Sequence, residues 1–205
     1  MDLKIKKITV GDYRTNCYVL TKGSDLAIVD PGSDAEKIRA ELTTYGTNFC
    51  YRYLLVTHAH HDHFTAVPEI IDSHPEFSVV AGEKEQGVFQ ELEWQEKYEG
   101  IKLPKIKVDC WITEKNQLEF GDSIIRVLET PGHTPGGIVF LIGNYLFSGD
   151  TLFYHTVGRT DLPGGDSKQL SDSLRKLLDL DEKIIVYPGH GKPTTIGEER
   201  GYYSL

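Results

Sequence analysis

The segment Thr57-His58-Ala59-His60-His61-Asp62-His63 decides how this chain is interpreted. Four of its residues are good ligands for divalent metal ions: His58, His60, Asp62 and His63. The apolar run Leu54-Leu55-Val56 directly precedes the segment and is typical of a buried strand. A strand that ends in a loop of ligands holds an open site on a rigid support. The sequence therefore predicts a metal site at the end of a strand.

Three more ligand-type residues follow glycines at the ends of apolar runs: His133, Asp150 and His190. A glycine lets the backbone turn tightly, so that the next side chain leaves the edge of the sheet. Seven candidates are too many for one tetrahedral ion but suit two, and a carboxylate can bridge two ions about 3.5–4 Å apart. We therefore predict two divalent metal ions, with Zn²⁺ preferred and Fe or Mn as the alternatives.

The two halves of the chain repeat one order of elements. In each half a strand ends at an aspartate (Asp30 or Asp150), a capped helix follows, and a later strand ends at a histidine (His58 or His190). Two such halves packed face to face give a four-layer αββα sandwich, with the site where the strand ends meet. We therefore predict an α/β (α+β) fold in which residues 1–205 form a single domain.

Local patterns place the elements of this fold. The expected strands are Ile5–Val10, Cys17–Leu20, Leu26–Val29, Ile124–Leu128, Ile138–Leu141, Tyr145–Ser148 and Ile184–Tyr187. One helix should begin at Ser33 with Glu36 completing a capping box, and end near Gly46. A second should span Ser167–Leu178, capped by Asp166. The charged stretch between Gly82 and Gly100 is expected to be one surface helix.

Composition limits the partners and the location. The net charge of -9 argues against broad binding of nucleic acid or of anionic membranes, because both are polyanions. No apolar run is long enough to span a bilayer, and the amino terminus lacks the apolar core of a signal peptide. Three cysteines without paired spacing predict buried free thiols rather than a disulfide framework. We therefore expect a cytoplasmic protein.

Taken in order along the chain, the motifs resemble the metallo-β-lactamase superfamily. They are Ile28-Val29-Asp30-Pro31-Gly32, His58–His63, Pro131-Gly132-His133-Thr134, Gly149-Asp150-Thr151 and Pro188-Gly189-His190-Gly191. The resemblance implies the αββα fold and two sets of ligands that share Asp150. One set is His58, His60, His133 and Asp150, and the other is Asp62, His63, Asp150 and His190. We further expect Asp30 to orient a ligand imidazole, the alternative being a carboxylate of the turn before Pro31.

Two further stretches, 158–166 and 194–199, resemble the glyoxalase II-like (hydroxyacylglutathione hydrolase) branch. This resemblance implies a metal-dependent hydrolase in which a metal-activated hydroxide attacks a thioester of the S-acylglutathione type. Asp62 would be the catalytic residue that orients the nucleophile, and Arg159 stands where the branch has a basic substrate contact. Two departures concern the substrate: we expect no counterpart of the branch's C-terminal helical domain, and Phe64-Thr65-Ala66 stands where the branch has a small Gly-rich stretch.

Other functions stay open at this stage. Persulfide dioxygenases with one iron also carry a Gly-Arg-Thr-Asp stretch like residues 158–161, and lactonases or lactamases share the fold. A non-catalytic metal-binding module is the alternative outside enzymes. We expect a small-molecule acyl-thiol partner, no nucleic acid, no membrane, and a monomer or small homo-oligomer. We also expect His61 to face solvent, and His155 either to line the pocket or to lie outside it.

Overall fold

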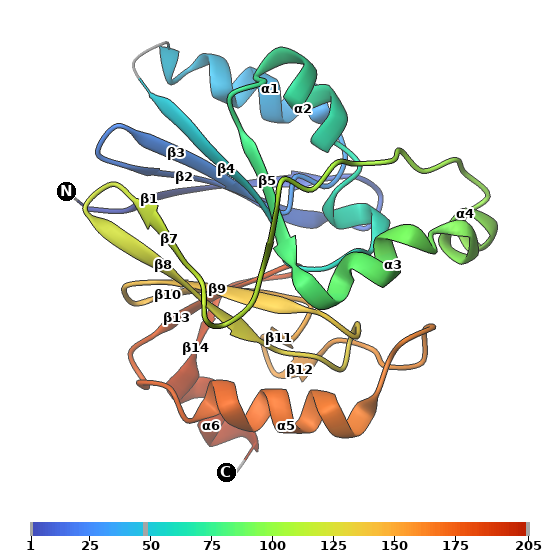
Figure 1. The fold of residues 1–205 in the computed structure, drawn as a ribbon. Helices are drawn as coiled ribbons and strands as arrows, with labels where there is room; N and C mark the ends of the chain where they lie inside the picture. Colours follow the sequence, from blue (N-terminus) through green and yellow to red (C-terminus); the bar gives the residue numbers. More distant parts are fainter. Residues whose placement is uncertain (1, 47–48, 204–205) are drawn as a thin grey trace.

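The computed structural model describes residues 2–46 and 49–203, and two large sheets stack face to face within it (Figure 1). The first sheet consists of β1 (Lys4–Val10), β2 (Thr15–Lys22), β3 (Asp25–Val29), β4 (Cys50–Val56), β5 (Ser78–Gly82) and β6 (Cys110–Ile112) in sequential order. Strands β1 to β3 pair antiparallel, and β3 to β6 pair parallel. The carboxyl ends of β3 and β4 therefore meet at one edge of the sheet.

The second sheet has one parallel pair of strands, next to one of its edge strands. Its strands are β7 (Gln117–Phe120), β8 (Ser123–Glu129), β9 (Ile138–Ile142), β10 (Tyr145–Gly149), β13 (Ile185–Pro188) and β14 (Thr194–Thr195). Their order is β14-β13-β10-β9-β8-β7, and only β10 and β13 run parallel. A separate two-stranded ribbon joins β11 (Leu152–Phe153) to β12 (Thr156–Val157). The carboxyl ends of β10 and β13 thus also lie side by side.

Helices cover the outer faces of both sheets (Figure 1). The first sheet is covered by α1 (Ala35–Thr43) and α2 (Val67–Ser73), and the second by α5 (Ser167–Leu178) and α6 (Ile196–Tyr203). The short helices α3 (Gln86–Gln90) and α4 (Glu93–Glu99) project at one end of the sandwich (Figure 1). The 3₁₀-helical turns His61–His63 and Glu83–Glu85 lie in the connections. This arrangement confirms the predicted four-layer αββα sandwich.

Apolar side chains fill all three interfaces between the four layers. Because side chains alternate along a strand, Tyr18, Val29 and Leu55 pack between the two sheets. Their neighbours Val19 and Ile28 pack instead beneath the helices of the first sheet. A third cluster joins the second sheet to α5 and α6. Strands buried on both faces explain why the sequence shows continuous apolar runs rather than alternation.

The two predicted capped helices had different outcomes. Helix α5 has the predicted bounds, and the Asp166 carboxylate accepts hydrogen bonds from the Lys168 and Gln169 amides at 2.9 and 3.0 Å. The capping box at Ser33 was wrong. Helix α1 begins after Asp34, which is left-handed (φ 53) and makes no side-chain cap. The Ser33 hydroxyl lies 3.3 Å from the Thr65 hydroxyl, so a tertiary contact replaces the local one.

The prediction of a single helix between Gly82 and Gly100 was also wrong. The chain leaves the helical conformation at Glu91 (φ -118, ψ 52), which separates α3 from α4. Leu92 is buried in the core beneath the first sheet's helices, and Gln95 is buried as well. Gln95 is held by hydrogen bonds with Ala59 and His61, and Leu92 by the core, so tertiary contacts rather than a local helical pattern position α4.

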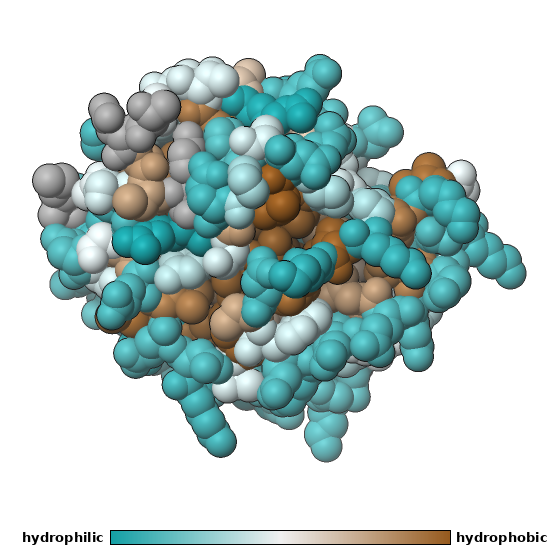
Figure 2. Space-filling view, turned by 45° about the horizontal axis from the view of Figure 1, so that its top comes forward, coloured by the Kyte–Doolittle hydropathy of each residue, from teal (hydrophilic) through white to brown (hydrophobic). Residues whose placement is uncertain are grey.

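The surface is mainly hydrophilic on the face shown in Figure 2, with apolar side chains gathered across its middle. Among the described residues, no helix combines the length and apolar character needed to cross a bilayer. All three cysteines are free. Cys17 is buried, but Cys50 is exposed and Cys110 is half-buried, so the expectation of buried thiols was wrong for these two.

Candidate metal centre

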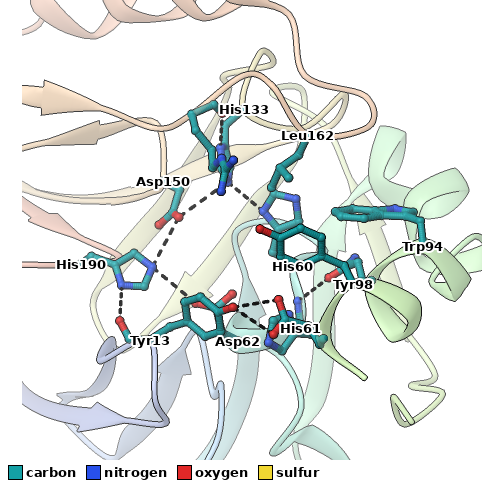
Figure 3. Close-up of a pocket in the computed structure, with 13 residues that line it drawn as sticks. Tyr13, His60, His61, Asp62, Trp94, Tyr98, His133, Asp150, Leu162 and His190 are labelled. Carbon is teal, nitrogen blue, oxygen red and sulfur yellow. Dashed lines mark hydrogen bonds and ion pairs between the residues drawn. The ribbon is translucent and has the colours of Figure 1, made fainter. Parts of the chain in front are cut away.

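The ligand-type residues converge where the carboxyl ends of strands from both sheets meet. His58 follows β4, Asp150 follows β10 and His190 follows β13, while His133 lies in the turn between β8 and β9. Figure 3 shows His60, His133, Asp150, His190 and Asp62 around one cavity. The structure therefore brings residues together that are up to 132 positions apart in the sequence, from His58 to His190.

Glycines let these chain segments approach one another. Gly149 has φ +48, and a Cβ at that position would press into the side chain of Thr57. A Cβ on Gly189 would lie 2.7 Å from His63 Cε1 and would also press against Asp150 Oδ1. Only a residue without a side chain leaves Asp150 and His63 in place at these turns.

Three imidazoles form the first group of ligand atoms. One ligand atom from each of His58, His60 and His133 lies within 4.8 Å of the other two. The Nδ1 atom of His60 and the Nε2 atom of His133 are 2.8 Å apart, and His133 Nε2 lies 3.6 Å from Asp150 Oδ2. All three imidazoles are buried.

A second group lies beside the first. Nε2 of His63 lies 3.4 Å from Asp62 Oδ2 and from Asp150 Oδ1, and Nε2 of His190 lies 3.4 Å from Asp62 Oδ2 and Asp150 Oδ2. Ligand atoms about 2.0–2.1 Å from a tetrahedral ion lie roughly 3.3 Å apart. These spacings therefore suit a metal ion, and Asp150 lies between the two groups.

Four imidazoles share one orientation, with Nδ1 against a protein oxygen and Nε2 toward the centre. The Nδ1 contacts are His58 to Thr57 Oγ1 at 3.0 Å, His63 to Asp30 Oδ2 at 3.0 Å, His133 to Arg159 O at 2.7 Å and His190 to Tyr13 O at 3.0 Å. Carbonyl and carboxylate oxygens only accept, so they hold the proton on Nδ1. Each Nε2 then carries a lone pair available to a metal.

Asp30 fixes two of these imidazoles. It is buried in the left-handed conformation (φ 50), and its carboxylate accepts from the Thr57 amide at 2.8 Å and the Thr57 hydroxyl at 2.9 Å. Because the Thr57 hydroxyl is used as a donor there, it accepts from His58 Nδ1. Asp30 thus contacts His63 directly and reaches His58 through Thr57.

The two groups differ in their electrostatics. Burial lowers the pKa of His58 well below its usual value and lowers that of His60 to about 3, so both are neutral. Burial also lowers the pKa of His63 and His190, but the carboxylates of Asp62 and Asp150 outweigh it and raise these values to about 9 and about 10. The first group offers uncharged ligands, whereas the second pairs its imidazoles with carboxylates.

The residues present fit metal ions. Nε2 of His58, Nε2 of His63 and Oδ1 of Asp150 are buried and have no hydrogen-bond partner. Buried polar atoms are costly to leave unsatisfied, and imidazole nitrogen with carboxylate oxygen is a set that Zn²⁺ and Fe bind readily. The structure therefore contains a metal site made of histidine and aspartate residues.

Comparison with known proteins agrees with this geometry. The model of the Metallo-beta-lactamase superfamily matches residues 10–190. The chain belongs to this superfamily. Its curated relative hydroxyacylglutathione hydrolase GloC from Haemophilus influenzae is 34% identical, over 97% of this chain and 95% of the relative.

Two solved structures are also similar over nearly the whole chain. BLEG-1 B3 metallo-beta-lactamase superposes with a TM-score of 0.89 at 36% identity, covering 97% of each chain. TTHA1623 in a di-iron-bound form superposes with a TM-score of 0.84 at 35% identity, covering 95% of this chain and 96% of the other. The protein is thus an enzyme of the metallo-hydrolase superfamily.

A cavity of about 150 Å³ opens onto the two groups of ligand residues in this chain. One wall is aromatic and comes from α4, with Trp94 edge-on to His60 at 5.8 Å between ring centroids and Tyr98 nearby (Figure 3). At the mouth, the Tyr13 hydroxyl donates to Glu99 at 2.8 Å. Arg159 also lines the cavity, and its guanidinium pairs with Asp161 through two contacts of 2.7 Å.

The histidines outside the two groups are now placed. His61 lines the cavity and is half-buried, with its ring 5.4 Å from Tyr13, so the expectation that it faces solvent was wrong in part. His155 is not among the residues that line the cavity. Its ring stacks between Tyr154 and Tyr202, at centroid distances of 3.8 and 4.3 Å.

Sequence reasoning missed several residues that support the centre. The Thr15 hydroxyl donates to Asp62 at 2.6 Å, and buried Glu85 and Gln95 bind the backbone of the histidine segment. Thr15, Glu85 and Gln95 lie in ordinary polar contexts with no recognisable spacing from the ligands, so only the tertiary structure identifies them.

Proposed function

We propose that this protein hydrolyses a small-molecule thioester of the S-acylglutathione type and uses two divalent metal ions. The observation that carries the proposal is the pair of ligand groups with Asp150 between them, at the base of an open cavity. The hydroxyacylglutathione hydrolase name of its relative supports the thioester as substrate class. The alternatives share this scaffold but differ in one requirement each: a persulfide dioxygenase would need one iron, and a lactonase or lactamase would cleave a different bond.

Each group would hold one ion. One position would be formed by His58, His60, His133 and Asp150, and the other by Asp62, His63, Asp150 and His190. Bound Zn²⁺ ions would supply Lewis acidity and would lower the pKa of a water molecule toward neutrality.

Asp62 is the residue we assign to orienting the attacking water, by accepting a hydrogen bond from it. Oδ2 accepts the Thr15 hydroxyl at 2.6 Å and faces both His63 and His190 at 3.4 Å. Burial raises the pKa of Asp62, but the neighbouring imidazoles outweigh it and hold the pKa well below its usual range. The carboxylate is therefore ionised and can accept a hydrogen bond from water at neutral pH.

The cavity walls would bind the two ends of the substrate. Trp94 and Tyr98 offer apolar surface for an acyl or thiol carbon chain. Arg159 offers a guanidinium to a carboxylate of the substrate, although the ion pair with Asp161 partly neutralises its charge. A volume of about 150 Å³ favours a small acyl group beside the metal centre.

Metal counting combined with a substrate panel tests the proposal. Purified protein should contain two ions per chain and release thiol from acyl-thiols, and the variants His58→Ala and Asp150→Ala should lose this turnover together with bound metal. The variant His155→Ala is the control, because this histidine lies outside the cavity. One iron per chain with oxygen consumption on persulfides, or preferential cleavage of lactones or lactams, would reject the thioesterase assignment.

A further inference from the structure

One buried carboxylate connects two ligand-bearing loops of the centre. Glu85, at the end of the 3₁₀-helix Glu83–Glu85, is fully buried. Its Oε2 accepts the amide of Ala59 at 2.6 Å, and its Oε1 accepts the amide of Gly136 at 2.7 Å. Ala59 lies between His58 and His60, whereas Gly136 lies three residues after His133. A single side chain thus joins the segments that carry all three imidazoles of the first group.

A buried amide holds the same peptide from the other side. Gln95 in α4 donates its Nε2 to the Ala59 carbonyl at 2.7 Å, and its Oε1 accepts the His61 amide at 2.9 Å. Only 2% of Gln95 is exposed, so solvent does not compete for these bonds. The Ala59 residue is therefore held at its N–H by Glu85 and at its C=O by Gln95.

The surrounding backbone is built for this contact. A Cβ on Gly136 would collide with the backbone of Lys84 and Glu85, so a glycine is needed for the His133 loop to reach the carboxylate. Burying a carboxylate is unfavourable unless hydrogen bonds compensate it, and here two amides do so. No atom of Glu85 is required by the proposed reaction, which leaves its placement to be explained.

We propose that Glu85 and Gln95 are positioning residues that set the spacing of His58, His60 and His133 and thereby the metal affinity of that position. This inference rests on the proposed two-metal centre. It assigns the hydrogen bonds of Glu85 and the Gln95–Ala59 hydrogen bond to one of the two positions, because Ala59 and Gly136 lie in the loops that carry His58, His60 and His133. Loss of such supporting hydrogen bonds weakens metal binding by about 10–100-fold.

The test is a titration of metal-free protein with Co²⁺, followed by visible absorption, in two variants that preserve shape. Glu85→Gln places an NH₂ group against an amide N–H, and Gln95→Glu places an oxygen against the Ala59 carbonyl. Each is made in the native chain and with His190→Ala, which removes a ligand of the other position. We expect Co²⁺ affinity to fall about 10–100-fold in the His190→Ala background, and one of two binding steps to weaken in the native background.

The control is Glu199→Gln. Glu199 is equally buried and accepts hydrogen bonds from the His155 amide and the Thr194 hydroxyl, away from the ligand loops. It should lower thermal stability without changing Co²⁺ affinity. Unchanged affinity in both Glu85→Gln and Gln95→Glu, or an equal loss in Glu199→Gln, would overturn the inference. Hydrolysis is not measured, so a failed thioesterase assay would leave this result intact.

Discussion

Replacing Gly189 with alanine probes how closely the backbone packs against the metal centre. The added Cβ would lie 2.7 Å from His63 Cε1 and 3.1 Å from the Gly149 carbonyl carbon, and it would press directly on Asp150 Oδ1. Ordinary contacts begin near 3.4 Å, so the His63 ring must move by about 0.7 Å. Metal–ligand distances tolerate only about 0.2 Å, and both metal positions include Asp150 in our assignment.

We therefore expect Gly189→Ala to weaken metal binding by about 100-fold or more, at both positions. The overpacking itself should cost the metal-free protein only about 1–3 kcal/mol of unfolding free energy. Calorimetric titration with Zn²⁺ measures the first quantity, and chemical denaturation of metal-free protein measures the second. Gly87→Ala in α3 is the control, because a Cβ there meets nothing within 4 Å. Two ions bound by Gly189→Ala with native affinity would refute this view of the packing.

Three further outcomes are expected. Metal binding should release about two protons at pH 7, and the metal affinity should rise as the pH rises toward about 9–10. The reason is that the pKa values of His63 and His190 are raised, so protons compete with the metal for these imidazoles. Calorimetry in two buffers of different ionisation enthalpy measures the proton release. Arg159→Ala should raise KM for an anionic thioester about 5-fold with little change in kcat, since the guanidinium is half exposed and paired with Asp161; steady-state kinetics checks it against an uncharged thioester. With free metal held at about 1,000 times Kd, each bound ion contributes about 4 kcal/mol, so chelating both ions should remove about 8 kcal/mol of stability, seen as a lower Tm.

The ligand residues were predictable because metal chemistry restricts both their type and their sequence context. His58, His60 and His63 are close in the sequence, and His133, Asp150 and His190 each follow a glycine at the end of an apolar run. The layers were predictable for a related reason, since continuous apolar strands require cover on both faces. Helix α5 was placed correctly because its cap and its apolar stripe agree with each other.

Tertiary contacts decided what the sequence alone did not specify. The Ser33 hydroxyl meets Thr65 instead of capping α1, and the hydrogen bonds of Gln95 with Ala59 and His61 position α4, which is separate from α3. Such contacts depend on distant segments and leave no local periodicity. The same reason hides Glu85, whose partners Ala59 and Gly136 lie 26 and 51 residues away.

Elemental analysis of the purified protein, coupled to thiol release from an S-acylglutathione, tests the central claim most directly. Our account predicts two divalent ions per chain and a rate of thiol release that rises with the second equivalent of metal added to stripped protein. Full thiol release at one equivalent, or fully loaded protein that leaves every acyl-thiol intact, would contradict it.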